Sequence, residues 1–334
     1  MKQLAADRAG AREVLQTLYA PIRSELDQVE EILGKELTSH YPFVDRLAKH
    51  GFRLGGKRLR PALVLFSAKA CGTLRPEHLV LAAAVEMIHT ATLIHDDVLD
   101  EATLRRHLDT VNARWDNEAS ILLGDYLFTR SFCLAASLRD SFACRALSET
   151  GRTMCEAELR QLASRGDFEL AEEDYLEIVA GKTAALTACC CRLGTHYAGA
   201  DAEECETLTR YGRHLGIAFQ IVDDLLDVQG DEATAGKSLG TDLAKQKSTL
   251  PLIRLLQQVT PPDREQLIAL LSRSGNHHRD ALRSWFQRSD ALAYARNKAL
   301  WYARQASAEV DLLAVTPTRD ALKQLTEFVV TRQQ

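Results

Sequence analysis

The chain has 334 residues, 46% of them hydrophobic, with a formal net charge of −5 and a sequence pI near 6.1. This content is enough to bury a large core. Nucleic-acid binding is disfavoured, because the chain has no basic block to neutralise phosphates. Eight cysteines are present, none spaced as CxxC, and three of them adjoin in an apolar segment at 189–191. They are typical of small buried side chains in a reducing compartment, not of a zinc site or a disulfide frame.

The chain begins with an amphipathic, charged segment that has no apolar core of the signal-peptide type. No run approaches the roughly 18 uninterrupted apolar residues of a membrane span. We therefore expect a soluble, cytoplasmic protein without a transmembrane segment.

Apolar residues recur at spacings of three and four along nearly the whole chain, which predicts helices. Pro21 predicts a helix start, since proline is tolerated in a first turn. Alternating runs typical of strands are almost absent. The sequence thus predicts an all-α protein of ten or more helices, forming one large helical domain over residues 1–334.

The segment LGGKRLRP, residues 54–61, places three cations beside two glycines. Glycines permit a tight turn, from which Lys57, Arg58 and Arg60 can present positive charge. Arginine can bind a phosphate with two parallel hydrogen bonds, and lysine acts as a point charge. Alone the segment means little; next to metal sites it predicts a phosphate subsite. His89, farther along, is either a core histidine or a donor to a second anion.

The first acidic cluster lies in IHDDVLDEATLRR, residues 94–106. Asp96 and Asp100 are four residues apart on one helix face, with Asp97 beside them. Such close carboxylates raise one another's pKa unless cations lie between them. Carboxylate oxygens suit Mg²⁺, which completes its shell with water and substrate phosphates. Arg105 and Arg106 follow and can bind the same phosphates. A solvated acidic helix end is the alternative for this motif alone.

A second cluster, FQIVDDLLD at 219–227, repeats the pattern with Asp223, Asp224 and Asp227. Each cluster ends a long apolar stretch. Two acidic clusters at the ends of two apolar helices predict one cavity, with metal at its rim and hydrocarbon below. Chance repetition is the alternative.

Polar residues between and after the clusters fit the same cavity. Lys182 and Thr183 interrupt an apolar segment, which is costly unless their polar ends reach a partner. Glu156, Glu158 and Gln161 are either surface residues or part of the site. After the second cluster, a glycine-bearing segment able to fold over a phosphate-filled mouth carries three lysines: Lys237, Lys245 and Lys247.

These segments resemble the trans-isoprenyl diphosphate synthases, the head-to-tail polyprenyl synthases. The matching blocks keep their order over most of the chain: GGKRLRP (55–61), HTATLIHDDVLDEATLRR (89–106), TVNARWDNEASILLGDYLF (110–128), GKTAAL (181–186), FQIVDDLLD (219–227) and GKSLGTDLAKQKSTLPLI (236–253). The resemblance implies an isoprenoid synthase fold, with helices around a deep central cavity, and usually a homodimer.

The resemblance also implies residue roles. Several Mg²⁺ ions would be held against an allylic diphosphate by Asp96, Asp97, Asp100, Asp223, Asp224 and Asp227. That diphosphate would be contacted by Arg105, Lys182, Thr183, Gln220 and Lys237, with Lys247 nearby. Isopentenyl diphosphate would be bound by Lys57, Arg60, His89 and Arg106.

The implied reaction joins isopentenyl diphosphate to an allylic diphosphate such as farnesyl diphosphate. Mg²⁺ and the cations neutralise charge on the departing diphosphate, and the apolar cavity shelters the carbocation from water. No side chain in these motifs is an obvious base. The resemblance suggests that the released diphosphate takes the final proton.

Product length depends on the residues beneath the first aspartates. Ala91 and Thr92 are small where the family uses bulky aromatics to stop growth early, and Phe128 and Phe132 could form a lower stop. This pattern favours a long-chain, octaprenyl-like product such as a quinone side-chain precursor. A short-chain farnesyl or geranylgeranyl diphosphate synthase is the alternative.

Three departures from the family pattern affect backbone turns. His107 to Asp109 replace a segment with Gly and Pro, Gln246 replaces Gly, and Ala157 replaces Gly. None removes a metal ligand, so we expect activity.

Three other functions are less consistent with the motifs. A class I terpene cyclase would carry a different second metal motif and has no use for GGKRLRP. A non-catalytic partner subunit would be expected to lose acids or arginines, and both clusters are complete here. A purely structural helical protein would gain nothing from six clustered aspartates that need neutralising.

Overall fold

The computed structural model describes residues 14–53, 56–229, 240–272 and 278–331, which are mostly helical. The first half contains η1 (Ala20–Ile22), α2 (Arg23–Glu36), α3 (Pro42–Arg53), α4 (Leu59–Cys71), α5 (Pro76–Leu99), α6 (Val111–Arg114), α7 (Asn117–Ala136) and α8 (Phe142–Ala163). The second half contains α9 (Glu172–Val179), the π-helical turn η2 (Ala180–Ala184), α10 (Ala185–Ala198), α11 (Ala202–Gln229), α13 (Thr241–Ala244), α14 (Leu250–Gln258), α15 (Pro261–Leu271), α16 (His278–Arg288), α17 (Ala291–Asp311) and α18 (Pro317–Thr331). The predicted all-α class is confirmed.

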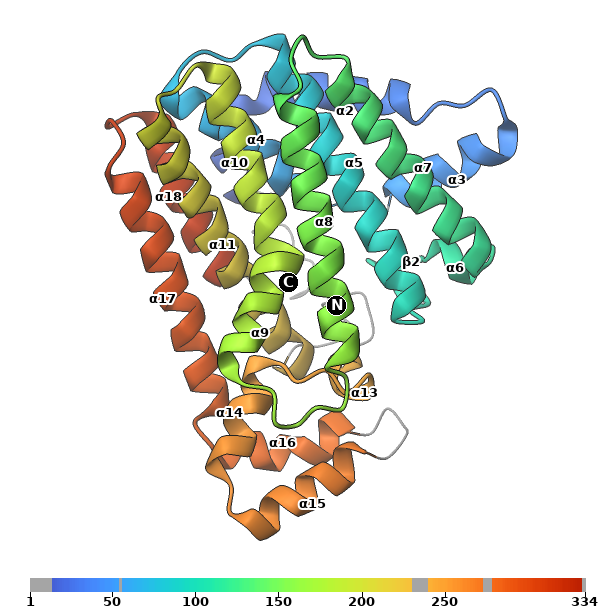
Figure 1. Cartoon of the computed structure of the whole chain (residues 1–334), viewed down its shortest axis with the longest axis vertical. Coiled ribbons are helices and arrows are strands. Elements are labelled where there is room, and N and C mark those ends of the chain that lie inside the picture. Colours follow the sequence, from blue (N-terminus) through green and yellow to red (C-terminus); the bar gives the residue numbers. More distant parts are fainter. Residues whose placement is uncertain (1–13, 54–55, 230–239, 273–277, 332–334) are drawn as a thin grey trace.

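Helix α5 is the central element and packs against α4, α7 and α10 (Figure 1). Pro76 stands in its first turn, as expected where an N–H would have no intrahelical partner. The helix is apolar on nearly all sides, a pattern that predicts burial all round. It is long and apolar enough to cross a membrane, but 67% of that apolar window is buried inside the protein.

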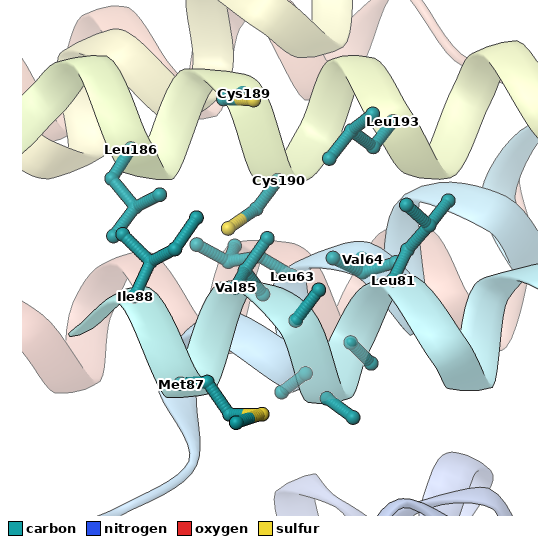
Figure 2. Close-up of a cluster of buried hydrophobic side chains, with 14 of the residues drawn as sticks. Leu63, Val64, Leu81, Val85, Met87, Ile88, Leu186, Cys189, Cys190 and Leu193 are labelled. Atoms are coloured by element: carbon teal, nitrogen blue, oxygen red, sulfur yellow. The ribbon is translucent and has the colours of Figure 1, made fainter. Parts of the chain in front are cut away.

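A layer of apolar side chains joins α4, α5 and α10 (Figure 2). Val85 and Ile88 of α5 lie on the side facing α10, whereas Met87 points away from α10. Cys190 projects from α10 into this layer, and its burial raises the pKa of its thiol well above the usual value. Cys189 and Cys191 are also buried. The prediction of small buried side chains is confirmed for these three cysteines, whereas Cys133 and Cys155 are exposed.

Helix α11 packs along α10 and α17, and the chain beyond it forms the end of the molecule that contains α14, α15 and α16 (Figure 1). A separate apolar cluster holds this end together, built around Leu252, Leu267 and Phe286. Fully burying such a side chain stabilises the fold by about 1.5–3 kcal/mol. Pro21 lies in η1, directly before α2, so the predicted helix start is confirmed.

The only sheet in the described part of the chain is a hairpin of β1 (Leu104–Arg105) and β2 (Leu108–Asp109). Its two turn residues, Arg106 and His107, have φ angles of 53° and 65°. Left-handed backbone at both positions is the hairpin geometry that fits the twist of two strands. Glycine would adopt it freely, so His107 is accommodated at a cost of about 1–2 kcal/mol.

Candidate active site

One cavity of about 1040 Å³ collects most of the residues that the sequence singled out. Its wall contains five of the six motif aspartates, from the last turns of α5 and α11: Asp96, Asp100, Asp223, Asp224 and Asp227. It also contains the predicted phosphate ligands Lys57, Arg60, His89, Arg105, Arg106, Lys182, Thr183, Gln220 and Lys247. The fold therefore brings both acidic clusters and their cations onto one surface.

Asp97 is the motif aspartate that does not line this cavity. Its side chain is 2% exposed and accepts hydrogen bonds from Nε of Arg105 at 2.9 and 3.1 Å. Nη2 of Arg105 lies 2.8 Å from the same carboxylate. Two residues that sequence reasoning assigned to metal and diphosphate therefore bind each other, and this contact holds the hairpin against α5.

Lys182 links the first acidic cluster to α8. Its ammonium lies 2.6 Å from the Glu158 carboxylate and 4.0 Å from that of Asp96, and it donates to Oε1 of Gln161 at 3.0 Å. Glu158 and Gln161 thus belong to the cavity wall, whereas Glu156 is exposed and does not line it. Burial raises the pKa of Asp96; Lys182 partly offsets this effect, and Glu158 and Asp100 reinforce it. Nearby cations therefore only partly stabilise the ionised form of Asp96.

Lys247 binds Asp100, the other half-buried acid of the first cluster. Its Nζ donates to the two oxygens of Asp100 at 3.0 and 3.3 Å and lies 3.4 Å from Asp242. Burial alone would raise the pKa of Asp100, but Lys247 brings it below the usual value. Gln246 has a left-handed φ of 55°, which explains the customary glycine there. Its carbonyl accepts the N–H of Gly166 at 2.9 Å, so the segment is held despite the substitution.

The second acidic cluster is oriented by neutral donors. The Tyr175 hydroxyl donates to Oδ2 of Asp224 at 2.6 Å, and the Gln220 amide donates to Oδ1 at 2.8 Å. Asp227 accepts the backbone N–H of Asp242 at 3.2 Å. Burial, followed by the nearby carboxylate of Asp242, raises the pKa of Asp224 to about 8. Hydrogen bonds thus fix the orientation of Asp224, while burial and the neighbouring carboxylate disfavour its ionised form.

The π-helical turn η2 places Lys182 and Thr183 on the cavity wall. A π turn inserts an extra residue into a helix and is frequent at functional sites. The Thr183 hydroxyl donates to Oε1 of Gln220 at 2.7 Å, so both polar residues of AGKTAAL find partners, as expected. The turn packs closely on α8: a Cβ at Gly181 would lie 2.7 Å from the Cβ of Ala157.

A second group of cations surrounds His89. Arg60 is half-buried, and its buried Nε has no hydrogen-bond partner among the described residues; desolvation lowers the pKa of Arg60. Burial, followed by Arg105, lowers the pKa of Arg106. The Arg106 guanidinium lies against Gly56, where a Cβ would be 2.2 Å from Nη2. Cations that repel one another in this way form a suitable site for an anion.

His89 should make the ligand-free protein less stable in acid. Burial and the surrounding arginines hold the pKa of His89 well below its usual value. In the unfolded chain His89 takes up a proton near pH 6.5, whereas in the folded chain its ring stays neutral. The free energy of unfolding therefore falls below that pH by about 1.4 kcal/mol per pH unit. Melting temperatures measured from about pH 7.5 to 5 should fall less steeply for His89→Gln than for the wild type. Equal slopes would contradict this assignment.

The residues proposed to set product length are only partly on the cavity. Thr92 lines it, and its hydroxyl donates to the backbone carbonyl of His89 at 2.8 Å. Ala91 is fully buried in the core. Phe128 and Phe132 pack against the core with ring centroids 5.3 Å apart, and neither is part of the cavity wall. Their role in product length stays a prediction.

Sequence reasoning missed several wall and supporting residues. Tyr175 stands seven residues before Lys182, a two-turn spacing that could have placed it on the same face. Asp242 lies in the matched block 236–253, but a place on the cavity wall was not predicted for it. Residues near both ends of the described chain also line the cavity, among them Leu15, Tyr19, Leu26, Phe328 and Val329. Lys237, a predicted diphosphate ligand, lies outside the described residues.

The donor set fits a hard divalent cation. In the ranges that the structure describes, no three His, Cys, Asp or Glu side chains are already grouped as metal ligands. The cavity nevertheless offers carboxylate oxygens, which Mg²⁺ and Ca²⁺ prefer. Burial raises the pKa of Asp96 and of Asp224, so a bound cation would be needed to favour their ionised forms. The residues able to hold it are Asp96, Asp100, Asp223, Asp224 and Asp227.

Known proteins are similar to this chain over most of its length. Residues 41–288 match the family model described as polyprenyl synthetase. The chain is 35% identical to the all-trans-nonaprenyl-diphosphate synthase (geranyl-diphosphate specific) of Rhodobacter capsulatus, over 96% of this chain and 98% of the relative. It is 36% identical to the octaprenyl diphosphate synthase of Escherichia coli (strain K12), over 92% and 95% of the two chains.

A solved structure agrees with these relatives. The crystal structure of polyprenyl synthase from Caulobacter crescentus CB15, complexed with calcium and isoprenyl diphosphate, has a TM-score of 0.91 and 34% sequence identity. The match covers 96% of this chain and 98% of the other. Since the family model, the relatives and the fold all agree, the chain belongs to the polyprenyl synthetase family and is a prenyltransferase.

Proposed function

We propose that the protein is a Mg²⁺-dependent trans-polyprenyl diphosphate synthase, which adds isopentenyl diphosphate to an allylic diphosphate head to tail. One observation carries this proposal: two aspartate clusters and two groups of cations line a single cavity. The calcium and isoprenyl diphosphate bound to the Caulobacter relative support it.

The aspartate side of the cavity is assigned to the allylic diphosphate. Mg²⁺ held by the motif aspartates would supply Lewis-acid stabilisation of charge on the leaving group. In this structure Lys182 and Lys247 are paired with carboxylates. Both line the cavity, so their ammonium groups can reach the oxygens of a bound diphosphate. Their positive charge favours breaking of the allylic C–O bond, with the electron pair leaving on the diphosphate.

The second group of cations is assigned to isopentenyl diphosphate. Lys57, Arg60 and Arg106 provide the charge, and His89 provides a neutral ring that can donate a hydrogen bond. Held there, the isopentenyl double bond attacks the allylic carbon and forms the new C–C bond. A proton then leaves the adjacent carbon for an oxygen of the released diphosphate.

Apolar residues of the wall exclude water from the carbocation. Leu93, Met154, Leu186 and Phe219 line the cavity together with Thr92. A dry surface prevents capture of the cation by water, which would end in simple hydrolysis. The small side chain of Thr92 leaves room below the first aspartates, and the names of the two relatives support a long-chain product.

A product assay tests this function. Purified protein is incubated with Mg²⁺, isopentenyl diphosphate and farnesyl diphosphate, and the dephosphorylated lipids are analysed by mass. We expect a ladder ending at one long all-trans prenyl alcohol, and no products when EDTA is present. A product that stops at fifteen or twenty carbons would indicate a short-chain synthase. A cyclic hydrocarbon, or activity only with an added subunit, would contradict the proposal.

We also propose a homodimer formed through α7 and α8. Large apolar side chains are exposed on these neighbouring helices: Ile121 and Leu122 on α7, and Leu159 and Leu162 on α8. Exposed apolar groups of this kind mark interaction surfaces in soluble proteins. Light scattering on the purified protein should give the mass of two chains.

A further inference from the structure

Arg58 stands between two predicted ligands of isopentenyl diphosphate, yet its guanidinium is bound to protein carboxylates. Nε and Nη2 donate to the two oxygens of Glu30 on α2 at 2.5 and 3.1 Å. Nη1 donates to Oε1 of Glu86 on α5 at 2.9 Å. The guanidinium carbon also lies 4.6 Å from the ring centroid of Phe52 on α3. Three helices therefore fix this one side chain.

The backbone at Arg58 explains the need for such fixing. Its φ and ψ are 52° and 34°, the left-handed conformation that side chains other than glycine rarely adopt. The same residue begins α4, because its carbonyl accepts the N–H of Ala62 at 3.0 Å. A strained backbone conformation persists only where its surroundings hold it. Here the surroundings are the two carboxylates and the aromatic ring.

The conformation of Arg58 also determines the directions of its neighbours in the sequence. Lys57 and Arg60 lie on either side of this strained residue, and both line the cavity. Lys57 lies with Nζ 5.1 Å from the ring centroid of Phe328, so its position is also defined by a contact. If the Arg58 side chain were released, the backbone could relax and carry Lys57 and Arg60 away from their present directions.

We propose that Glu30, acting through Arg58, is a positioning residue for the isopentenyl diphosphate subsite. This inference rests on the proposed function. Glu30 is half exposed, lies outside the region matched by the family model, and carries the same sign of charge as the substrate. A carboxylate close to an anion site normally weakens anion binding. If Glu30 positions the subsite, removing its charge should weaken the binding of isopentenyl diphosphate. Electrostatic repulsion alone predicts the opposite, tighter binding.

The test is Glu30→Gln, compared with Glu31→Gln on the same helix. The control removes the same charge one residue away, at an exposed side chain for which the described chain shows no ion pair. For Glu30→Gln we expect KM for isopentenyl diphosphate to rise about tenfold, as for the loss of one charge-assisted hydrogen bond. KM for farnesyl diphosphate and kcat should stay within about twofold. The control should leave all three unchanged.

Several outcomes would overturn the inference. If Glu30→Gln leaves KM for isopentenyl diphosphate unchanged, the ion pair is only structural; if KM falls, Arg58 binds the substrate itself and Glu30 competes for it. Arg58→Lys is the second variant, because it keeps the charge and loses the two-pronged contact with Glu30. It should raise the same KM, and an unchanged value would count against positioning. A wild-type protein without prenyl transfer would instead contradict the proposed function.

Discussion

Replacing Asp96 by asparagine should lower prenyl transfer by about a hundredfold to a thousandfold and leave the fold intact. The change removes one of the few carboxylates able to hold metal against the substrate diphosphate, and losing one such electrostatic contact costs about 10²–10³ in rate. Two quantities should be measured: kcat at saturating Mg²⁺, and the melting temperature in EDTA. Because burial raises the pKa of Asp96, a neutral amide should not lower the melting temperature.

An exposed carboxylate provides the control for this prediction. Asp125 on α7 has an exposed side chain that lies 3.5 Å from His95, and it is not part of the cavity wall. Asp125→Asn should retain nearly full activity. If Asp96→Asn keeps more than about a tenth of wild-type kcat, the first aspartate cluster does not hold the catalytic metal.

Gly181→Ala should cost about a hundredfold in activity and about 1–3 kcal/mol in stability. The new Cβ would stand 2.7 Å from that of Ala157, well inside the distance of about 3.5–4.0 Å at which carbon atoms make their best contact. Overpacking of this size moves backbone. The segment that must move is η2, which carries Lys182 and Thr183, and misplacing catalytic groups by about 1 Å can cost 10²-fold.

A compensating substitution makes this prediction specific. Removing the opposing methyl group in the double variant Ala157→Gly, Gly181→Ala should restore most of the activity, since the two helices can again approach. Gly34→Ala serves as the control, because a Cβ there meets nothing within 4 Å. It lies within α2 and should be neutral or slightly stabilising. Full activity in Gly181→Ala alone would show that η2 tolerates displacement.

Local patterns in the sequence were sufficient for the fold class and for most of the site. Helical periodicity predicts the helices directly, and the spacing of Asp96 with Asp100 requires that they share a helix face. The repeat at Asp223 to Asp227, together with the matched family blocks, then predicts a common cavity. These inferences depend on residues that are close in sequence, or on motifs that keep their order.

Contacts between distant residues could not be predicted in this way. Asp97 looks equivalent to Asp96 in the motif, and only the hairpin after α5 decides that it pairs with Arg105. Phe128 and Phe132 have the right size for a cavity floor, but packing between α7 and α8 decides which way they point. The same is true of Tyr175, whose hydroxyl reaches Asp224 from another helix.

The chain ends contribute to the cavity although the family model does not include them. That model spans residues 41–288, whereas Leu15, Tyr19 and Leu26 precede it and Phe328 follows it. The aspartate and arginine motifs do not determine which residues stand at these outer positions. Substitutions at these outer positions can therefore reshape one wall of the cavity while every motif residue is retained. Orthologues classified by these motifs alone would be placed in one group even where their cavities admit different ligands.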